Sequence, residues 1–346
     1  MYRTVINTIS LLLLFPLINF VFRFVEDIPS TEKKREISFN LLLESNLKEK
    51  FNIIEEAFER KFPARNLMIQ KYNYFLWFVL NSSPKRTVLK GQNDWLFIFL
   101  GQGANGRDYS FNESDFLAYS HGIKKLENLC NSNNIKFYSA IVPEKFNIYP
   151  EELKATDLST IKKDKYFRIY NELSKSANKT VFFHEELISR KHKDDVYYKT
   201  DTHWNSVAAF IAAQKLFSKM NGNDRKVDLL SEEDFNLVHM RSSGRDIAEY
   251  LSLSKFFLDD EYIFLPKQIL EKRQKKLKIL VIHDSYFYPM VEFFRFQFNE
   301  VDTWNFVQNE KSINYGELFN SKPDIVLFIL LERHIGNYDK RVFGHL

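Results

Sequence analysis

The chain has 346 residues, of which 45% are hydrophobic and 16% aromatic, and its formal net charge is +4. This length and apolar content provide ample material for a sizeable core. The single cysteine, Cys130, excludes an intramolecular disulfide. The densest basic cluster, residues 271–276, is typical of a solvated loop before a strand, so no nucleic-acid partner is predicted.

The first predicted element is an apolar stretch at residues 5–25, about the length that a bilayer core requires. No small-residue cleavage site follows Val25. We therefore predict that residues 1–28 form an uncleaved, single-pass membrane anchor, with a removed signal peptide as the alternative. Basic residues flank the stretch on both sides, so charge counting does not fix its orientation.

Residues 29–87 are predicted to form a helical lead-in to the rest of the chain. Apolar residues recur at helical spacing from 38 to 80, with a break at Pro63. The apolar run at residues 72–80 is too short to cross a membrane. Turn-forming residues at 91–94 then lie between two apolar runs and predict a hairpin.

From about residue 115 the pattern alternates between helix and strand. Strands are predicted at residues 135–142, 181–183, 279–282, 301–304 and 325–330, and helices at 115–131, 159–177, 206–220, 290–298 and 313–319. This alternation predicts an α/β fold with a doubly wound, mostly parallel sheet flanked by helices. We assign it to one domain, residues 88–346.

Residues 229–266 interrupt the alternation and are predicted to be an insertion within that domain. The segment is rich in charged residues and contains scattered aromatic side chains. It is a candidate wall for a substrate groove, with Phe235, Tyr250 and Tyr262 as candidate lining residues.

Asp201 and His203 are the first candidate catalytic residues. In an extended or turning segment, residues two apart point the same way, so both side chains can enter one cleft. A histidine base with an orienting carboxylate is the pairing that nucleophilic catalysis uses. The alternative is that the segment only begins the next helix, with Asn205 or Ser206 as its N-cap.

Ser285 is the candidate nucleophile. It follows the apolar run 279–282, which suits a buried parallel strand, and precedes a predicted helix with Pro289 near its first turn. Ligands bind at this edge of open α/β sheets, and N–H groups at a helix N-terminus can stabilise an oxyanion. The alternative is that Asp284 and Ser285 only cap that helix.

These motifs resemble the alginate O-acetyltransferase family of the AlgJ and AlgX type, which has an SGNH-hydrolase-like domain. Asp201-Thr202-His203-Trp204 and Asp284-Ser285-Tyr286-Phe287 carry the resemblance. Further stretches follow in the expected order, at residues 62–65, 88–97, 142–150, 322–326 and 332–333.

The resemblance implies that Asp201, His203 and Ser285 form a catalytic triad, with no cofactor. Two positions depart from the family pattern: His283 stands where a glycine is frequent, and Tyr286 separates Ser285 from the usual aromatic residue, here Phe287. The implied function is O-acetylation of an exported polysaccharide through an acetyl-serine intermediate. The implied partner is a membrane-bound acyltransferase that supplies acetyl groups, with the catalytic domain in the periplasm and the anchor in the inner membrane.

Two alternatives remain open at the level of sequence, and a third, a metal centre, is not favoured. A carbohydrate acetyl esterase would use the same triad, and water in place of the sugar hydroxyl. A non-catalytic polysaccharide-binding member of the family would be favoured if the bulky His283 spoils the oxyanion site. A metal centre on Asp201 and His203 has no nearby histidine or cysteine cluster to complete it, so no metal is predicted.

Overall fold

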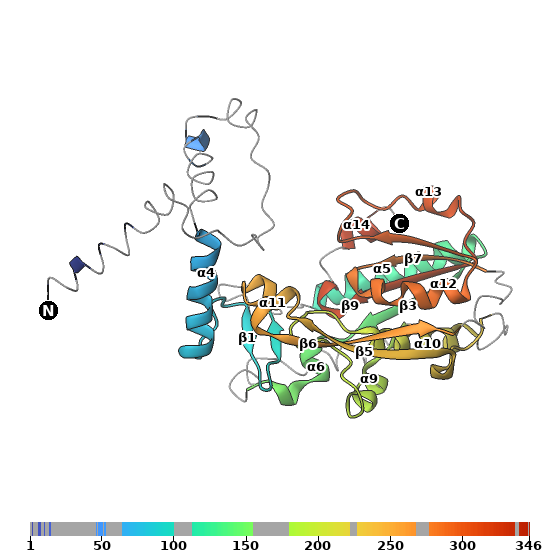
Figure 1. The fold of residues 1–346 in the computed structure, drawn as a ribbon. Helices are drawn as coiled ribbons and strands as arrows, with labels where there is room; N and C mark the ends of the chain where they lie inside the picture. Colours follow the sequence, from blue (N-terminus) through green and yellow to red (C-terminus); the bar gives the residue numbers. More distant parts are fainter. Residues whose placement is uncertain are drawn as a thin grey trace. The chain divides into compact units, whose positions relative to one another are not determined.

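The computed structural model describes residues 64–99, 113–154, 180–221, 227–267, 277–335, 339–344 and 346, with a few positions before residue 53. The chain divides into two compact units (Figure 1). The smaller unit comprises residues 1–85 and 248–256, and the larger unit comprises residues 86–247 and 257–346.

The larger unit is built on a five-stranded sheet in the order β4-β3-β9-β7-β8, in which every neighbouring pair is parallel. Its strands are β3 (Lys136–Val142), β4 (Thr180–Phe182), β7 (Lys278–His283), β8 (Glu300–Asn305) and β9 (Ile325–Leu331). Every residue of the central strand β9 is buried, as a parallel strand covered on both faces requires. All five strands lie where the sequence predicts them, so the mostly parallel α/β fold is confirmed.

Helices cover both faces of this sheet (Figure 1). One layer contains α5 (Glu113–Ser132), α13 (Tyr315–Phe319) and α14 (Asp339–Phe343); the other contains α9 (His184–Lys191), α10 (Ser206–Asn221) and α12 (Val291–Gln297). Alternate side chains of each strand enter opposite layers, so Val281 belongs to the core on the side of α10 and α12, whereas Ile282 belongs to the core on the side of α5. Cys130 is buried in the α5 layer, as its helical pattern indicates.

Two antiparallel hairpins complete the larger unit. β1 (Val88–Lys90) pairs with β2 (Leu96–Ile98) around the predicted turn. β5 (Phe235–Ser243) pairs with β6 (Leu258–Pro266) along the whole of both strands, within the predicted insertion. The short helices α6 (Lys145–Ile148) and α11 (Asp246–Tyr250) follow β3 and β5 respectively.

One candidate groove residue is corrected by the structure. Phe235 is only 4% exposed, and its ring packs against those of Phe210 and Phe293 at centroid distances of 5.5 and 5.7 Å. It is a core residue, because the first residue of β5 faces α10 and α12 and not solvent. Tyr262 is half-buried and stacks on His239 at 4.9 Å.

Pro289 changes the start of the helix after Ser285. Ser285–Met290 form a 3-10 helix that contains the proline, and α12 begins only at Val291. Proline lacks an N–H and its ring clashes with the carbonyl four residues earlier, so an α-helix does not form through it.

The smaller unit contains α4 (Arg65–Tyr74), which runs directly into a π-helix (Phe75–Val79). The buried Asn73 amide donates a hydrogen bond to the Leu251 carbonyl at 2.7 Å. Residues 248–256 therefore pack on this helix.

Several predictions fall on residues that the structure does not describe. They concern most of the membrane anchor at residues 1–28, the break at Pro63, the helix at 159–177 and the basic cluster at 271–276. Within the described part of the chain, no helix has both the length and the apolar character needed to span a bilayer.

Candidate active site

Asp201 and His203 lie on a short loop that is closed by a β-bridge between Tyr197 and Trp204. The Asn205 side chain then accepts hydrogen bonds from two N–H groups in the first turn of α10, at 3.0 and 3.2 Å. Asn205 is therefore the N-cap that the sequence offers. The loop is fixed at one end by the bridge and at the other by the capped helix.

Ser285 lies at the carboxyl end of β7, where the buried Asp284 caps the 3-10 helix. The Asp284 carboxylate accepts hydrogen bonds from the N–H of Tyr286 at 3.0 Å and of Leu331 at 2.6 Å, and it contacts Nδ1 of His334 at 2.8 Å. Asp284 is thus a structural residue that joins the ends of β7 and β9. Ser285 is held at the sheet edge where ligands bind in open α/β folds.

The structure brings the three predicted residues into one hydrogen-bonded chain. His203 Nδ1 lies 2.7 Å from Asp201 Oδ1, and His203 Nε2 lies 2.8 Å from Ser285 Oγ. The His203 backbone N–H also donates to Asp201 Oδ1 at 2.9 Å, which holds the carboxylate against the ring. A carboxylate, an imidazole and a hydroxyl in this order can activate a serine for nucleophilic attack.

The electrostatics of the pair favour a charged Asp201. Burial lowers the pKa of His203, but the hydrogen bond and negative charge of Asp201 outweigh burial, so this pKa is raised above its ordinary value. Burial acts to raise the pKa of Asp201, yet the contact with His203 holds it below its usual value. The His203 side chain is still 29% exposed, so its ring is open to solvent.

Lys145 holds the loop that carries Asp201 and His203 by binding the backbone of that loop. Its buried Nζ lies 2.7 Å from the Leu96 carbonyl, 2.7 Å from the Lys199 carbonyl and 3.0 Å from the Asp201 carbonyl. Three carbonyl oxygens thus take the three donors of the ammonium group. Burial lowers the pKa of Lys145 to about 7, although the carboxylates of Asp259 and Asp201 act in the opposite direction.

Asp259, on β6, holds the same loop by accepting hydrogen bonds from the N–H groups of that loop. Its buried carboxylate accepts from the N–H of Lys199 at 2.5 Å and of Thr200 at 3.1 Å, and also from the Thr200 hydroxyl. That hydroxyl in turn accepts from the Arg245 N–H at 2.8 Å. The segment 229–266 therefore forms part of the support of the site.

Asp246, from the same segment, places a second carboxylate beside the histidine. It accepts from the Thr202 N–H at 2.8 Å and hydroxyl at 2.6 Å, and its Oδ2 lies 3.8 Å from His203 Nδ1. Burial and the charge of Asp201 raise the pKa of Asp246 to about 6. Donor atoms of Asp201, His203 and Asp246 lie within 4.8 Å of one another, a set of donor types that divalent cations accept and that sequence spacing did not reveal.

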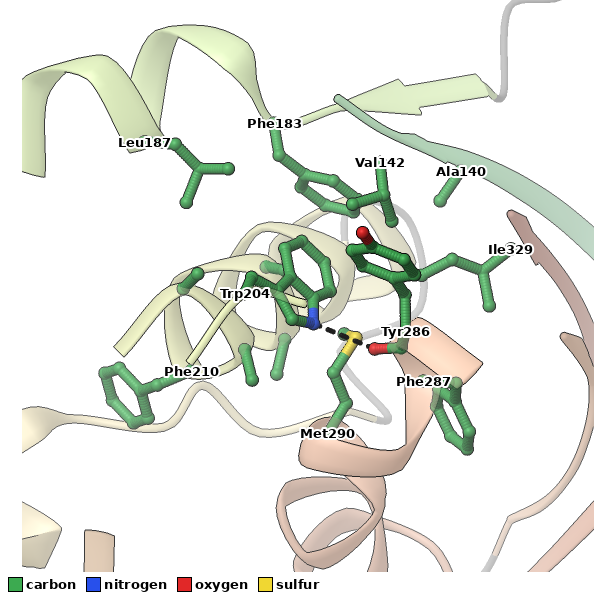
Figure 2. Close-up of a cluster of buried hydrophobic side chains, with 14 of the residues drawn as sticks. Ala140, Val142, Phe183, Leu187, Trp204, Phe210, Tyr286, Phe287, Met290 and Ile329 are labelled. Atoms are coloured by element: carbon green, nitrogen blue, oxygen red, sulfur yellow. Dashed lines mark hydrogen bonds between the residues drawn. The ribbon is translucent and has the colours of Figure 1, made fainter. Parts of the chain in front are cut away.

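Trp204 and Tyr286 connect the two halves of the site (Figure 2). Trp204 Nε1 donates to the Tyr286 carbonyl at 2.9 Å, the dashed line in Figure 2, and the Tyr286 hydroxyl donates to the Thr202 carbonyl at 2.6 Å. Both rings are almost fully buried, with centroids 5.9 Å apart. Tyr286, which separates Ser285 from Phe287, therefore fastens the loop that carries His203 to the turn that carries Ser285.

His283, the second departure from the family pattern, is part of the packing. It is buried, and its ring lies 5.0 Å from that of Phe287 and 5.3 Å from that of Tyr288. Its Nδ1 lies 2.5 Å from the Asp284 carbonyl. Burial lowers the pKa of His283, which favours the neutral imidazole.

The stretches at residues 142–150 and 332–333 meet at the same sheet edge. Glu144 is buried, and its Oε1 lies 3.2 Å from Nε of Arg333. Burial raises the pKa of Glu144, and the charge of Arg333 opposes this. Motifs that are far apart in the chain thus pair across the ends of β3 and β9.

Sequence reasoning missed three supporting residues. Lys145 lies in one of the stretches that carry the resemblance, so a signal was present, but its role was not predicted. Asp246 and Asp259 lie in a charged segment without a motif, and only the fold brings them to the loop.

A parallel α/β sheet with serine, histidine and aspartate hydrogen-bonded at its carboxyl edge is the arrangement expected of an SGNH-hydrolase-like domain. Residues 88–271, more than half of the chain, match the family described as SGNH hydrolase-like domain, acetyltransferase AlgX. The chain belongs to this family, so the resemblance read from its motifs is confirmed.

Known relatives agree with this assignment. The probable alginate O-acetylase AlgJ of Pseudomonas syringae pv. tomato is 27% identical over 168 residues, covering 47% of this chain and 40% of that protein. The AlgJ of Pseudomonas aeruginosa is 24% identical over 232 residues, covering 63% and 54%. The chain therefore spans about half the length of these curated relatives.

A solved structure shares the fold. Bacillus cereus PatB1 superimposes with a TM-score of 0.56 at 14% identity, covering 72% of this chain and 96% of PatB1. At this identity the likeness extends to the fold alone.

Proposed function

We propose that this protein is a serine-dependent O-acetyltransferase that adds acetyl groups to hydroxyls of an exported polysaccharide. The observation that carries the proposal is the hydrogen-bonded chain from Asp201 through His203 to Ser285. Membership of the acetyltransferase family and the O-acetylase names of its relatives support acetyl as the transferred group.

In the first half-reaction, His203 Nε2 takes the proton of the Ser285 hydroxyl while Ser285 Oγ attacks the acetyl carbonyl of the donor. Asp201 stabilises the imidazolium that forms and holds Nδ1 in the protonated form. The bond from the acetyl carbon to the donor then breaks, and His203 returns the proton to the leaving group. The product is an acetyl ester on Ser285.

In the second half-reaction, a sugar hydroxyl gives its proton to His203 Nε2 and attacks the acetyl-serine carbonyl. The ester bond to Ser285 Oγ breaks, and His203 returns the proton to that oxygen. The acetylated sugar leaves and the free enzyme is restored.

The oxyanion donors are constrained by the Asp284 cap. The N–H of Tyr286 donates to the Asp284 carboxylate and that of Phe287 to the Asp284 carbonyl. We therefore infer that the Ser285 N–H is the donor on this turn, with a second donor from a neighbouring segment.

Membrane attachment and cellular location form part of the same proposal. The apolar stretch at residues 5–25 supports an anchor in the inner membrane with the catalytic domain in the periplasm. Such an anchor would keep the domain beside a membrane-bound acyltransferase that supplies acetyl groups.

The test is the intact mass of the purified chain after exposure to a small activated acetyl ester. We expect one acetyl group, mapped to Ser285, in the wild type and none in Ser285→Ala. An unmodified wild type with no ester turnover would reject the covalent mechanism and favour a binding role.

The esterase alternative is separated by adding acceptor oligosaccharides to the acetylated enzyme. A transferase passes the acetyl group to sugar hydroxyls faster than to water. Free acetate as the sole product across a panel of acceptors would instead identify an esterase.

A further inference from the structure

The smaller unit carries an exposed row of apolar side chains on α4 and the π-helix. Tyr72, Phe75 and Val79 are 61%, 48% and 60% exposed, and Met68 is also exposed. Their spacings of four, three and four residues place them along one side of the helix. We call Met68, Tyr72, Phe75 and Val79 the apolar stripe.

The buried side of this helix carries two polar residues and one tryptophan. Gln70 and Asn73 are both buried, with Trp77 one turn further on. The Asn73 amide donates its hydrogen bond to the Leu251 carbonyl. The stripe leaves four large apolar side chains next to one another at the surface, and such contiguous exposed apolar groups mark contact surfaces.

The charges around the apolar stripe favour an anionic surface. Residues 64–85 include Arg65, Lys71 and Lys85 but no aspartate or glutamate, and residues 248–256 of the same unit add one acidic residue, Glu249, and one basic residue, Lys255. Lys71 is exposed in the last turn of α4, and Lys85 lies over the Tyr250 ring at 5.1 Å. Basic residues near a bilayer are attracted to anionic headgroups, and aromatic residues of this type concentrate at the membrane interface.

The length of the helix excludes a membrane span. α4 and the π-helix contribute ten and five residues, fewer than a bilayer crossing requires. A short helix with an exposed apolar row and basic neighbours can instead lie in the plane of the interface. The apolar stretch at residues 5–25 is about 40 residues upstream, so a bilayer is within reach of this unit.

We propose that the apolar stripe rests on the surface of a lipid bilayer, with α4 and the π-helix parallel to the membrane plane. The proposal does not depend on the chemistry at Ser285. Its failure would leave acetyl transfer intact, and failure of acetyl transfer would leave the membrane contact intact.

The test uses the full chain reconstituted in vesicles that contain phosphatidylglycerol and phosphatidylcholine. An environment-sensitive fluorophore is attached to a cysteine at the stripe position Phe75→Cys. The native Cys130 is buried, and the chain without the added cysteine measures any background labelling. Nitroxide-bearing lipids then report contact with the bilayer, and iodide reports contact with water.

We expect the nitroxide lipids to quench the fluorophore at position 75 and iodide to lose access to it. The matched control is Leu117→Cys on α5, an equally apolar position that is 61% exposed in the other unit. That probe should be quenched by iodide and not by the lipids.

Three results at position 75 would overturn the proposal. Quenching by iodide alone would place the apolar stripe in water. Protection from both quenchers would mean that protein covers it, either another part of this chain or a second copy. Lipid quenching that is equal at positions 75 and 117 would show non-specific adsorption.

Discussion

The two halves of the candidate active site are held by different kinds of interaction. Ser285 follows β7, whose backbone pairs with β8 on one side and β9 on the other. Asp201 and His203 lie on a loop outside the sheet, and the buried side chains of Lys145 and Asp259 bind the backbone of that loop.

The position of each half therefore depends on the sequence in a different way. The position of Ser285 follows from the pairing of β7 with its neighbours and from the cap that Asp284 provides. Many apolar sequences could form such a strand. The place of the base depends on two buried charged groups, and removing either leaves backbone groups buried without partners. Substitutions of Ser285 should therefore change activity alone, whereas substitutions of the residues that hold the loop should change both stability and activity.

The largest effect is expected from Ser285→Ala, which removes the nucleophile and leaves the sheet and the Asp284 cap in place. We expect acetyl transfer to fall by about a thousandfold or more, with an unchanged melting temperature. The measurement is turnover of an activated acetyl ester beside a thermal unfolding curve. Ser218→Ala on α10 is the control and should retain activity; retained activity in Ser285→Ala itself would remove the assignment.

Lys145→Met tests the support of the base. Three buried carbonyls would lose their donor, so we expect the free energy of unfolding to fall by about 2–4 kcal/mol and kcat to fall with it. Urea unfolding gives the first quantity and ester turnover the second. As a control, Lys278→Met removes the exposed pair with Glu300 and should leave both unchanged. Equal urea midpoints for the two variants would contradict the role assigned to Lys145.

Tyr286→Phe tests the link between the halves. The Thr202 carbonyl would lose its hydrogen bond while the ring stays packed, so we expect a loss of about 1 kcal/mol in unfolding free energy. Because the loop that carries His203 is then less firmly held, kcat should fall more than KM rises. An unchanged kcat would show that the loop is positioned without this bond.

At the pH optimum, Asp246→Asn should change kcat/KM less than the other substitutions do. Below the optimum its effect on kcat/KM should become visible. The Asp246 carboxylate helps to raise the pKa of His203, which must be neutral to act as base. Without that charge the pKa of His203 falls, so the acid limb of the pH–rate profile should move to lower pH. The measurement is kcat/KM across the acid range, and a limb that stays in place would exclude this coupling.

Much of the larger unit follows from sequence pattern. The run at residues 279–282 is apolar throughout because β7 is covered on both faces, and the turn after it places Ser285 at the sheet edge. The pairing of Asp201 with His203 follows from their spacing. These features depend on local sequence, so they are predictable without the fold.

The roles of Lys145, Asp246 and Asp259 in holding the loop were not predictable, because they depend on contacts between segments that are distant in the sequence. Asp259 reaches the loop only because β6 pairs with β5 beside it, and nothing local distinguishes Asp259 from the two acidic residues that follow it. The prediction that Phe235 lines a groove was wrong, because an aromatic residue in a charged segment looks the same in the sequence whether it lines a groove or packs in a core.

The sheet order has a consequence for the synthesis of the protein. Both neighbours of β7 in the sheet, β8 and β9, follow it in the chain. A ribosome that releases the chain from its N-terminus therefore delivers Asp201, His203 and Ser285 before the two strands that pair with β7. Until residue 331 has emerged, β7 lacks at least one of its two sheet neighbours, so the position of Ser285 beside His203 is not yet fixed.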